Sequence, residues 1–385
     1  MTLTPFTIDI PQAHLDDLRE RIARTRRAPV SVAQDWSRGT PPAVLDRVLA
    51  HWGGDFDWRA AERRLNEFDQ VKISVPLEDG TPFGIHTLRA GTPGKTPLLL
   101  VHGWPDGFVR FEKVIPLLAD RFELVVPSIP GFAFSDKPHI ALGPIGVADL
   151  FAEAMTALGH ERFAVHGADL GSQVGEQLAL RHPERLIGLH LGDIPLRRLR
   201  ALAAGDPSAL SPEEQASLDQ LSEWETAEGA YARLQRTKPQ TIGAALDDSP
   251  AGLAAWIVEK FQAWSDLGLD GADVFDVYTL DELCTNLTIY WVTVSATSAA
   301  QYYYDNGHSV LTNDAVTVPT GVAMWPKDLV HGSRASVERW FPVRRWTEQP
   351  RGGHFGPWEE PQLWADDVIG FFEGLGDGLG GGLGG

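Results

Sequence analysis

The sequence predicts an α/β fold, in which a mostly parallel sheet carries helices on both faces and a helical segment is inserted over it. Short apolar runs alternate with helical patterns at 96–193, and one of these runs is LLLV at 98–101. Continuous apolar runs are typical of strands buried on both faces of a parallel sheet. The alternation stops at 194–306, where the pattern is helical, and it resumes at 307–375. We therefore expect a core of 96–193 and 307–375, with 194–306 as a helical lid over the carboxyl ends of the strands, where ligands bind in open α/β sheets.

Composition narrows the class of protein. The 385 residues allow a single domain with an inserted subdomain, and 43% hydrophobic with 22% charged residues is ordinary for a soluble globule. The net charge of −19 argues against nucleic acid or an anionic membrane as partner, because such surfaces attract an excess of Lys and Arg. The single cysteine, Cys284, excludes an internal disulfide and a multi-thiolate metal site. The N-terminal sequence MTLTPFTIDIPQ indicates neither a signal peptide nor a membrane anchor, so we expect a cytoplasmic protein.

Residues 1–95 form a leader region that precedes the alternating pattern. The alternation of apolar residues at 6, 8 and 10 predicts a short strand, and a helix follows Pro11 with Leu15, Leu18 and Ile22 on one face. Further elements are expected in this order: helices at 42–52 and 58–68, then strands at 71–75 and 83–88 around a turn at 78–80. The apolar faces of this leader must be covered by something downstream.

The core elements follow in sequence. The first half predicts strands at 98–101, 124–126, 163–165 and 186–191, and helices at 111–118, 146–158 and 172–181. The lid pattern predicts helical faces at 214–236, 252–267 and 281–304. The second half predicts strands at 318–324 and 343–347 and a helix at 361–372. The Gly-rich tail at 376–385 is expected to be disordered.

The chain is organised around residues 162–177, RFAVHGADLGSQVGEQ, which read as strand, sharp turn and helix. Small residues flank Asp169 on both sides, including Gly167 and Gly171. This spacing is what a nucleophile elbow requires, because the central residue adopts a strained backbone conformation that bulky neighbours would block. On this window alone, an Asp that caps an ordinary helix explains the letters equally well.

Three residues with catalytic side chains each follow a predicted strand: Asp169, Asp328 and His354. Taken singly, an Asp after Pro-Lys is usually a turn residue and a His after Gly-Gly is usually a loop residue. Together they stand in the chain order nucleophile, acid, histidine. A carboxylate nucleophile attacks carbon and leaves an ester on the enzyme.

The chain resembles the epoxide hydrolases of the microsomal type, within the α/β-hydrolase superfamily, nearly from end to end. The resemblance is carried by the leader PFTIDIPQAHLDDLRERIARTRR, by HGWP at 102–105, by HGADLGSQVG, WPKDL and GGHF, and by the lid segments YARLQRTKPQTIGAALDDSPAGLAAWIVEKF and IYWVTVSATSAAQYYYDN. HGWP and the lid segments are the parts of the resemblance that are specific to this family. The resemblance implies an α/β-hydrolase fold and the conversion of an epoxide and water into a vicinal diol through a covalent ester.

The resemblance also implies roles for named residues. Asp169 is the nucleophile, and His354, oriented by Asp328, activates water. The lid tyrosines are Tyr231 and Tyr303, which donate a proton to the epoxide oxygen. The backbone N–H groups of Trp104 and Leu170 form the oxyanion hole.

Two assignments stay open at this stage. Tyr302 and Tyr304 flank Tyr303, and from the residues alone this cluster is more often packing than catalysis. Glu338 and Glu348 are alternative acids, although neither directly follows a predicted strand. The family resembled carries either Glu or Asp at the acid position, and the side chain of Asp328 is the shorter of the two. No cofactor and no metal is implied, because the chain lacks a phosphate-cradling Gly loop and a His/Cys cluster with ligand spacing.

Other functions remain as alternatives. A haloalkane dehalogenase shares the Asp–His–acid plan but commonly has a Trp after the nucleophile, where this chain has Leu170. A serine esterase is disfavoured because no Ser occupies the elbow, and a binding module without catalysis is the non-enzymatic alternative. The expected partners are a small apolar epoxide, held in an aromatic pocket, and water; a homodimer through the leader and lid is allowed. The identity of the epoxide and its pathway, detoxification or natural-product biosynthesis, are left open.

Overall fold

The computed structural model describes residues 1–27, 33–267 and 272–378. Within these ranges, one nine-stranded sheet has the order β1-β2-β3-β5-β4-β6-β7-β8-β9. Its strands are β1 Thr2–Pro5, β2 Asp69–Pro76, β3 Pro82–Gly91, β4 Thr96–Val101, β5 Phe122–Pro127, β6 Phe163–Gly167, β7 Leu186–Leu191, β8 Thr320–Met324 and β9 Val343–Glu348.

The sheet is mostly parallel, as the sequence predicts. The first three strands are antiparallel to their neighbours, and β3 pairs antiparallel with β5. From β5 through β4 and β6 to β9, every neighbouring pair is parallel. Leu98 to Val101 of β4 are all buried, because helices cover both faces of this central strand.

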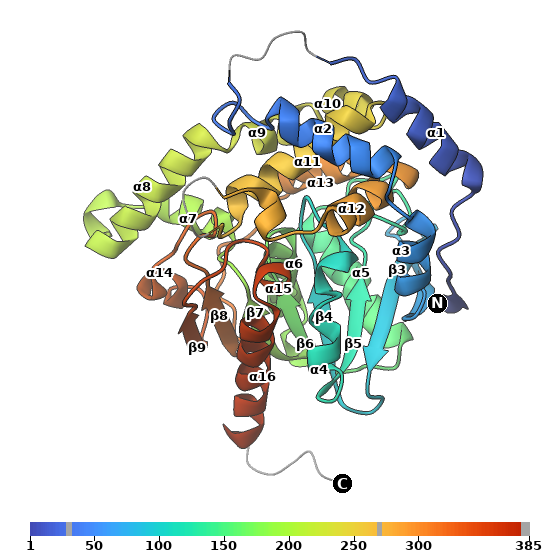
Figure 1. Ribbon diagram of the computed structural model, residues 1–385. Helices are drawn as coiled ribbons and strands as arrows, with labels where there is room; N and C mark the ends of the chain where they lie inside the picture. Colours follow the sequence, from blue (N-terminus) through green and yellow to red (C-terminus); the bar gives the residue numbers. More distant parts are fainter. Residues whose placement is uncertain (28–32, 268–271, 379–385) are drawn as a thin grey trace.

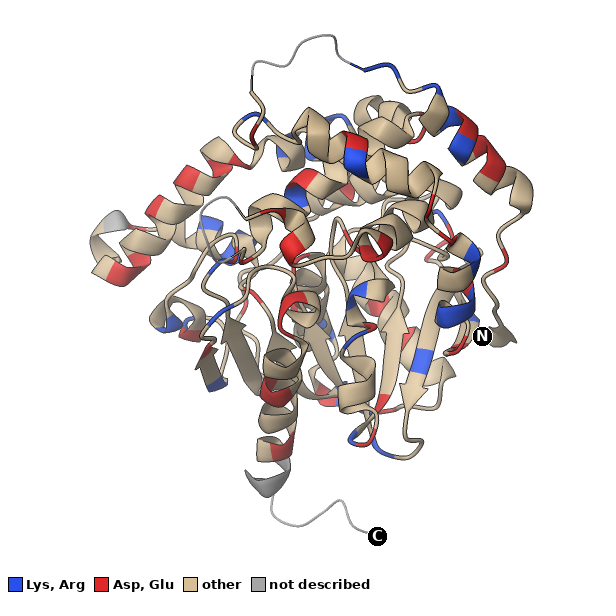
Figure 2. Cartoon of the chain, in the orientation of Figure 1, with Lys and Arg blue, Asp and Glu red and all other residues tan. Residues whose placement is uncertain are grey.

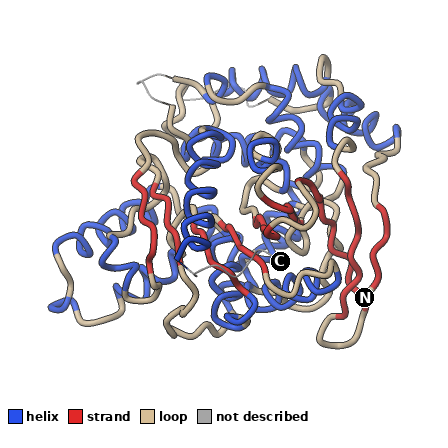
Figure 3. Tube along the Cα trace, turned by 90° about the horizontal axis from the view of Figure 1, so that it is seen from below, coloured by secondary structure: helices blue, strands red, loops and turns tan. Residues whose placement is uncertain are grey.

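Helices cover the two faces of the sheet. On one face α4, Ile115–Leu118, packs against α16, Pro361–Gly378. On the other face α5, Pro144–Ala157, packs against α6, Leu170–Arg181. Figure 1 shows α4 and α16 in front of the strands, and Figure 3 shows the strands running between the helical layers from below. The arrangement is the α/β-hydrolase fold.

A set of lid helices lies between β7 and β8 in the sequence and above the sheet in Figure 1. These helices are α7 Leu196–Ala203, α8 Pro212–Ala227, α9 Ala230–Thr237, α10 Pro239–Leu246, α11 Pro250–Trp264, α12 Leu280–Val292 and α13 Ala296–His308.

The leader helices cover the lid. The helices α1, Gln12–Ala23, and α2, Pro42–Gly53, pack on α11 and α12. Trp52 Nε1 donates to Thr288 Oγ1 at 2.8 Å, and the Arg21 Nη1 atom lies 2.7 Å from Asp248 Oδ1. The apolar face of α1 is buried, so the expectation that downstream residues cover the leader is confirmed. The remaining leader helix, α3 Trp58–Leu65, is shorter than predicted.

The strand predicted from the alternation at 6, 8 and 10 is wrong. The strand β1 ends at Pro5, and its residues are exposed. Ile8 and Ile10 are still buried, and their backbone amides donate to side chains instead of to a neighbouring strand, Ile8 to Asn66 Oδ1 at 2.9 Å and Ile10 to Glu62 Oε1 at 2.8 Å. The alternation therefore reflects burial against the α3 region without a partner strand at these positions.

Two long lid faces are broken where one helix was expected. The face at 214–236 divides into α8 and α9 at Gly229, whose amide donates to Trp224 O. The face at 281–304 divides into α12 and α13 at Val294, which has a φ of +51°. A β-branched residue in this region interrupts a helix.

Two smaller predictions also differ from the structure. The helix expected at 111–118 is a 3-10 turn, Phe108–Phe111, followed by α4. The last helix, α16, continues through Gly378, into the start of the tail expected to be disordered, while 379–385 lie outside the described residues. Among the helices of the described ranges, none is long and apolar enough to cross a membrane.

Candidate active site

Asp169 occupies a strained turn between β6 and α6. Its φ of +57° and ψ of −121° lie where a residue with a Cβ is rarely found. A Cβ on Gly167 would lie 2.1 Å from Gly171 O, and one on Gly171 would lie 2.3 Å from Val101 O, so both positions require glycine. In the described chain the Asp169 side chain makes no capping hydrogen bond to α6. The ordinary-cap interpretation of this window is therefore wrong, and the turn has the geometry of a nucleophile elbow.

The carboxylate of Asp169 is held from two sides. Its Oδ1 accepts a hydrogen bond from the backbone N–H of Trp104 at 2.9 Å, in the loop that follows β4. Its Oδ2 lies 3.5 Å from Nε2 of His354. Leu170, the other predicted oxyanion residue, is the first residue of α6 and lines the same cavity as Asp169.

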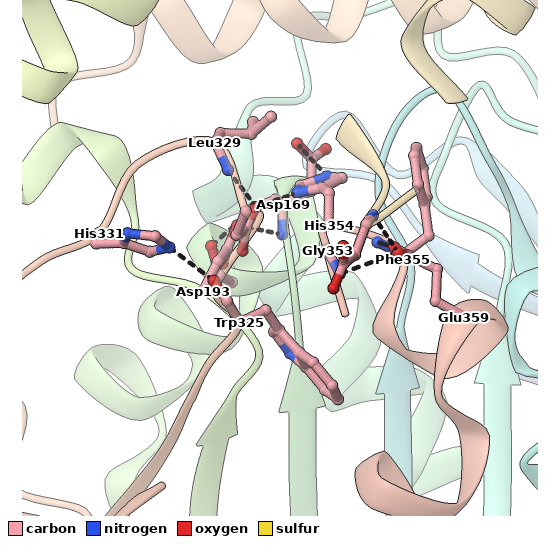
Figure 4. A network of polar contacts seen from close by, with 12 residues as sticks. Asp169, Asp193, Trp325, Leu329, His331, Gly353, His354, Phe355 and Glu359 are labelled. Atoms are coloured by element: carbon pink, nitrogen blue, oxygen red, sulfur yellow. Dashed lines mark hydrogen bonds and ion pairs between the residues drawn. The ribbon is translucent and has the colours of Figure 1, made fainter. Parts of the chain in front are cut away.

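His354 and Asp328 form a buried pair beside this carboxylate. Nδ1 of His354 lies 2.7 Å from Oδ1 of Asp328, which also accepts the backbone N–H of Leu329. Burial alone lowers the pKa of His354, but the carboxylates of Asp328 and Asp169 outweigh it, so the pKa lies well above the ordinary value. Figure 4 shows His354 between Asp169 and the loop that follows β8. The structure thus brings the three predicted residues together.

The alternative acids lie elsewhere. Glu338 forms an ion pair with Arg334 at 2.7 Å on the surface, and Glu348, the exposed last residue of β9, accepts from Trp346 Nε1 at 3.3 Å. The shorter side chain of Asp328 reaches His354 directly.

Tyr231 and Tyr303 face the same cavity as Asp169. The ring of Tyr231 stacks on Trp104 at 4.8 Å, and Tyr303 meets the edge of Trp104 at 5.9 Å. The two tyrosine rings are 6.0 Å apart. Burial, together with the charge of Asp169, raises the pKa of each phenol well above 10, so both phenols keep the proton that a hydrogen-bond donor needs.

The neighbours of Tyr303 point to other surroundings. Tyr302 is buried against Phe132, with ring centres 6.3 Å apart, and Tyr304 is exposed and stacks on His308 at 4.1 Å. Neither lines the cavity that contains Asp169. This geometry favours Tyr303 over its neighbours as the second lid tyrosine.

The cavity has a volume of about 430 Å³ and lies between the elbow and the lid. The expected aromatic wall is present in Trp224, Tyr231 and Tyr303. The cavity is not uniformly apolar, however, because three arginines from the lid also line it: Arg197, Arg200 and Arg236.

Asp193 is a site residue that sequence reasoning missed. It follows β7, and its Oδ2 accepts the backbone N–H of Asp169 at 2.8 Å. Its Oδ1 is buried without a hydrogen-bond partner in the described residues. Burial, and next the charge of Asp328, raise the pKa of Asp193 to about 7. The available signal was its position two residues after a predicted strand.

Asp193 also belongs to a group of side chains whose spacing could hold a metal ion. One atom each of Asp193, Asp328 and His354 lie within 4.8 Å of one another. The direct hydrogen bond between His354 and Asp328 accounts for the closeness of that pair without a cation.

Glu359, on α15 Gly356–Glu359, supports the loop that carries His354. Its carboxylate accepts the backbone N–H groups of Gly353 at 3.0 Å and Phe355 at 2.8 Å, on either side of the histidine (Figure 4). Burial raises the pKa of Glu359 to about 7. From the other side, Arg110 Nη2 donates to His354 O at 3.1 Å. Sequence reasoning missed both residues, because neither stands in a recognisable motif.

Comparison with known proteins agrees with this geometry. Residues 3–111 match the family model described as "Epoxide hydrolase N terminus", and 96–255 match the model "alpha/beta hydrolase fold". Epoxide hydrolase 1 of Sus scrofa is 32% identical over 411 residues, which cover 96% of this chain and 88% of that protein. This chain belongs to the epoxide hydrolases.

Solved epoxide hydrolases share its architecture over nearly the whole length. The crystal structure of juvenile hormone epoxide hydrolase from the silkworm Bombyx mori aligns with a TM-score of 0.87 at 28% identity, covering 98% of this chain and 96% of that one. The Aspergillus niger epoxide hydrolase aligns with a TM-score of 0.81 at 27% identity, covering 97% of each chain. The resemblance to microsomal-type enzymes is thereby confirmed.

Proposed function

We propose that this epoxide hydrolase converts an epoxide and water into a vicinal diol through a covalent ester on Asp169. The observation that carries the proposal is the position of one carboxylate. Asp169 Oδ1 accepts the Trp104 amide, its Oδ2 lies 3.5 Å from His354 Nε2, and two buried phenols line the cavity that it faces.

In the first step, Asp169 attacks a ring carbon of the epoxide and the carbon–oxygen bond of the ring breaks. The released oxygen takes a proton from Tyr231 or Tyr303, which leaves a hydroxyl group on the product and a tyrosinate on the enzyme. A proton donor is needed here because an alkoxide is a poor leaving group in a cavity with little water. The raised pKa values of the phenols keep them protonated before the reaction.

In the second step, His354 takes a proton from water, and the hydroxide attacks the ester carbonyl of Asp169. Amides of Trp104 and Leu170 stabilise the oxyanion. The ester bond breaks, the departing oxygen takes the proton from His354, and the new carboxylic acid of Asp169 returns its proton to the tyrosinate.

The electrostatics suit this order of events. The charge of Asp169 raises the pKa of His354 in the resting enzyme. Esterification removes that charge, so the pKa of the imidazole falls and His354 releases its proton to solvent, which leaves the neutral form that can accept a proton from water. The first step therefore prepares the state of His354 that the second step requires.

A dehalogenase is the second candidate, and the site favours it less. A departing halide needs donors beside the nucleophile. The residue after Asp169 is the apolar Leu170, while the tyrosines suit an oxygen that must gain a proton. Cytoplasmic location and a homodimer remain predictions from the sequence.

The test uses His354→Gln, with His139→Gln as its control because His139 is exposed and pairs with Asp79 on the surface. Given an aryl epoxide, His354→Gln should accumulate an adduct on the peptide that contains Asp169, detected by mass spectrometry. His139→Gln should form diol at the rate of the unmodified enzyme. Failure to trap an adduct in His354→Gln, together with continued diol formation, would contradict the ester.

A further inference from the structure

The arginines in the cavity wall need an explanation. The chain carries 52 acidic residues against 33 Lys and Arg, and Figure 2 shows Asp and Glu spread over the helices, with several along α8. Against that background, Arg197 and Arg200 on α7 and Arg236 on α9 line the cavity that contains Asp169. Their pairing with acidic residues is unequal.

Of the three arginines, Arg200 has its charge paired with a carboxylate. Its Nε lies 2.8 Å from Glu225 Oε1 on α8, and both side chains are more than a third exposed. Arg200 therefore has a partner and reaches solvent.

The guanidinium group of Arg197 is only partly paired with hydrogen-bond acceptors. Its Nε lies 2.6 Å from Glu176 Oε2, and its Nη1 donates to Thr312 O at 2.9 Å. Its Nη2 is buried without a hydrogen-bond partner among the described residues. Glu176 is shared, because its other oxygen pairs with buried Arg198. One buried carboxylate thus faces two guanidinium groups, and the nearby Asp314 is exposed.

Arg236 is the arginine of the three whose charge has no acidic partner among the described residues. It is half-buried, and its side chain takes part in no hydrogen bond or ion pair in the ranges that the structure describes. Its side chain lies against Gly307 on α13, where a Cβ would come within 2.5 Å of Arg236 Cδ and Cγ. Gly307 thereby makes room for the arginine. Asn306 and Ser309, on either side of Gly307, line the same cavity.

The cavity separates its charges. Asp169, Asp193 and Asp328 gather at the histidine, whereas Arg197 and Arg236 lie beside the segment 306–313. A guanidinium group with free N–H donors binds a carboxylate strongly, because both charge and geometry match. The acidic cluster would repel the same carboxylate, so a ligand that carries one is oriented in the cavity.

Resting on the proposed function, we propose that the epoxide accepted by this enzyme carries a carboxylate, which Arg236 binds while Asp169 attacks the ring, with Arg197 adding positive charge to the same wall of the cavity. The substrate class is an epoxy carboxylic acid. Its size is limited by the cavity of about 430 Å³, which lies toward the lower end of ordinary ligand sites.

The test compares epoxy carboxylic acids with their methyl esters over a range of chain lengths, as the ratio of kcat/KM for acid to kcat/KM for ester. For one chain length the unmodified enzyme should favour the acid. In Arg236→Gln this ratio should fall about tenfold to a hundredfold, chiefly through KM for the acid, because a charge-assisted bond is lost. Arg233→Gln, an exposed arginine on the same helix, should leave the ratio unchanged.

Gly307→Ala provides a second variant that keeps the arginine. The added Cβ should displace Arg236, so the acid-to-ester ratio should fall without removal of any charge. An unmodified enzyme that opens the esters as well as the acids, or an Arg236→Gln variant that keeps the ratio, would overturn the carboxylate assignment and leave the proposed function standing. Absence of diol from every acid and ester would contradict both.

Discussion

The backbone N–H of Trp104 donates to Oδ1 of Asp169 at 2.9 Å, across two loops that are 65 residues apart. One donor of the proposed oxyanion hole is therefore in place before any substrate binds, and it fixes one oxygen of the nucleophile. Donors that need no rearrangement are the ones that stabilise developing charge most effectively. The Trp104–Asp169 relationship depends on the close approach of Gly103, where a Cβ would lie 2.4 Å from Asp169 Cβ.

We accordingly predict that Gly103→Ala lowers the steady-state rate of diol formation by about 100- to 1,000-fold, the cost of misplacing an oxyanion donor. The matched control is Gly107→Ala in the same loop, where a Cβ would meet no atom within 4 Å among the described residues. It should keep nearly full activity. Equal activity in the two variants would mean that the approach of this loop to Asp169 is unimportant.

The lid tyrosines should be separable by substitution. Tyr231→Phe and Tyr303→Phe should each slow formation of the ester by about 100-fold, at the lower end for loss of a general acid, because the second phenol still donates. Rapid mixing with a fluorescent or chromogenic epoxide measures this step.

Tyr302→Phe and Tyr304→Phe are the controls. The Tyr302 hydroxyl is buried without a hydrogen-bond partner in the described ranges, and Tyr304 is exposed. Neither substitution should slow the ester-forming step. If Tyr302→Phe slowed this step as much as Tyr303→Phe, the assignment of Tyr303 as the second proton donor would be contradicted.

The pKa of His354 should depend on the charge of Asp169. In the resting enzyme the carboxylates of Asp328 and Asp169 hold this pKa well above 6.5, against the lowering effect of burial. Asp169→Asn removes one negative charge at nearly constant shape, so the pKa of His354 should fall. A pH titration of the imidazole by NMR measures it, with exposed His139 as an internal reference. An unchanged value would remove the electrostatic link between the two steps.

Asp193 should make stability depend on pH. Its pKa is raised to about 7 in the fold, so between pH 4 and 7 the folded state holds a proton that the unfolded state has released. This contribution to stability is fully present below about pH 4 and is lost as pH rises toward 7.

Asp193→Asn cannot titrate and should lack that loss. Thermal unfolding at pH 4.5 and at pH 7.5 should therefore show a smaller decrease in the variant than in the unmodified protein. Asp366→Asn on the surface of α16 controls for a general loss of negative charge. Parallel pH profiles for Asp193→Asn and the unmodified protein would contradict a raised pKa.

Much of the core could be predicted from the sequence, because local signals and tertiary structure agree there. The run at 98–101 is apolar since β4 is buried on both faces, and Gly167 and Gly171 are required by close backbone contacts. Asp169, Asp328 and His354 all follow strands that end at one edge of the sheet, which explains why chain order alone indicated a shared site.

The lid was less predictable because its side chains are selected by packing between helices. Three consecutive tyrosines look alike in sequence, although successive residues of a helix point about 100° apart. The packing of α13 against its neighbouring helices decides that Tyr303 is the one that lines the cavity. Arg197 and Arg236 stand on separate helices, so their shared cavity leaves no local pattern. Likewise, nothing local indicated that the backbone amides of Ile8 and Ile10 donate to side chains of the α3 region.

The most direct test of the ester is a single turnover in heavy-oxygen water, with enzyme in excess over epoxide. If Asp169 forms the ester, water oxygen enters the carboxylate, and mass spectrometry should find the label in the Asp169 peptide while the diol stays unlabelled. If water attacks the epoxide directly, the diol should carry the label and Asp169 none, which would contradict the account.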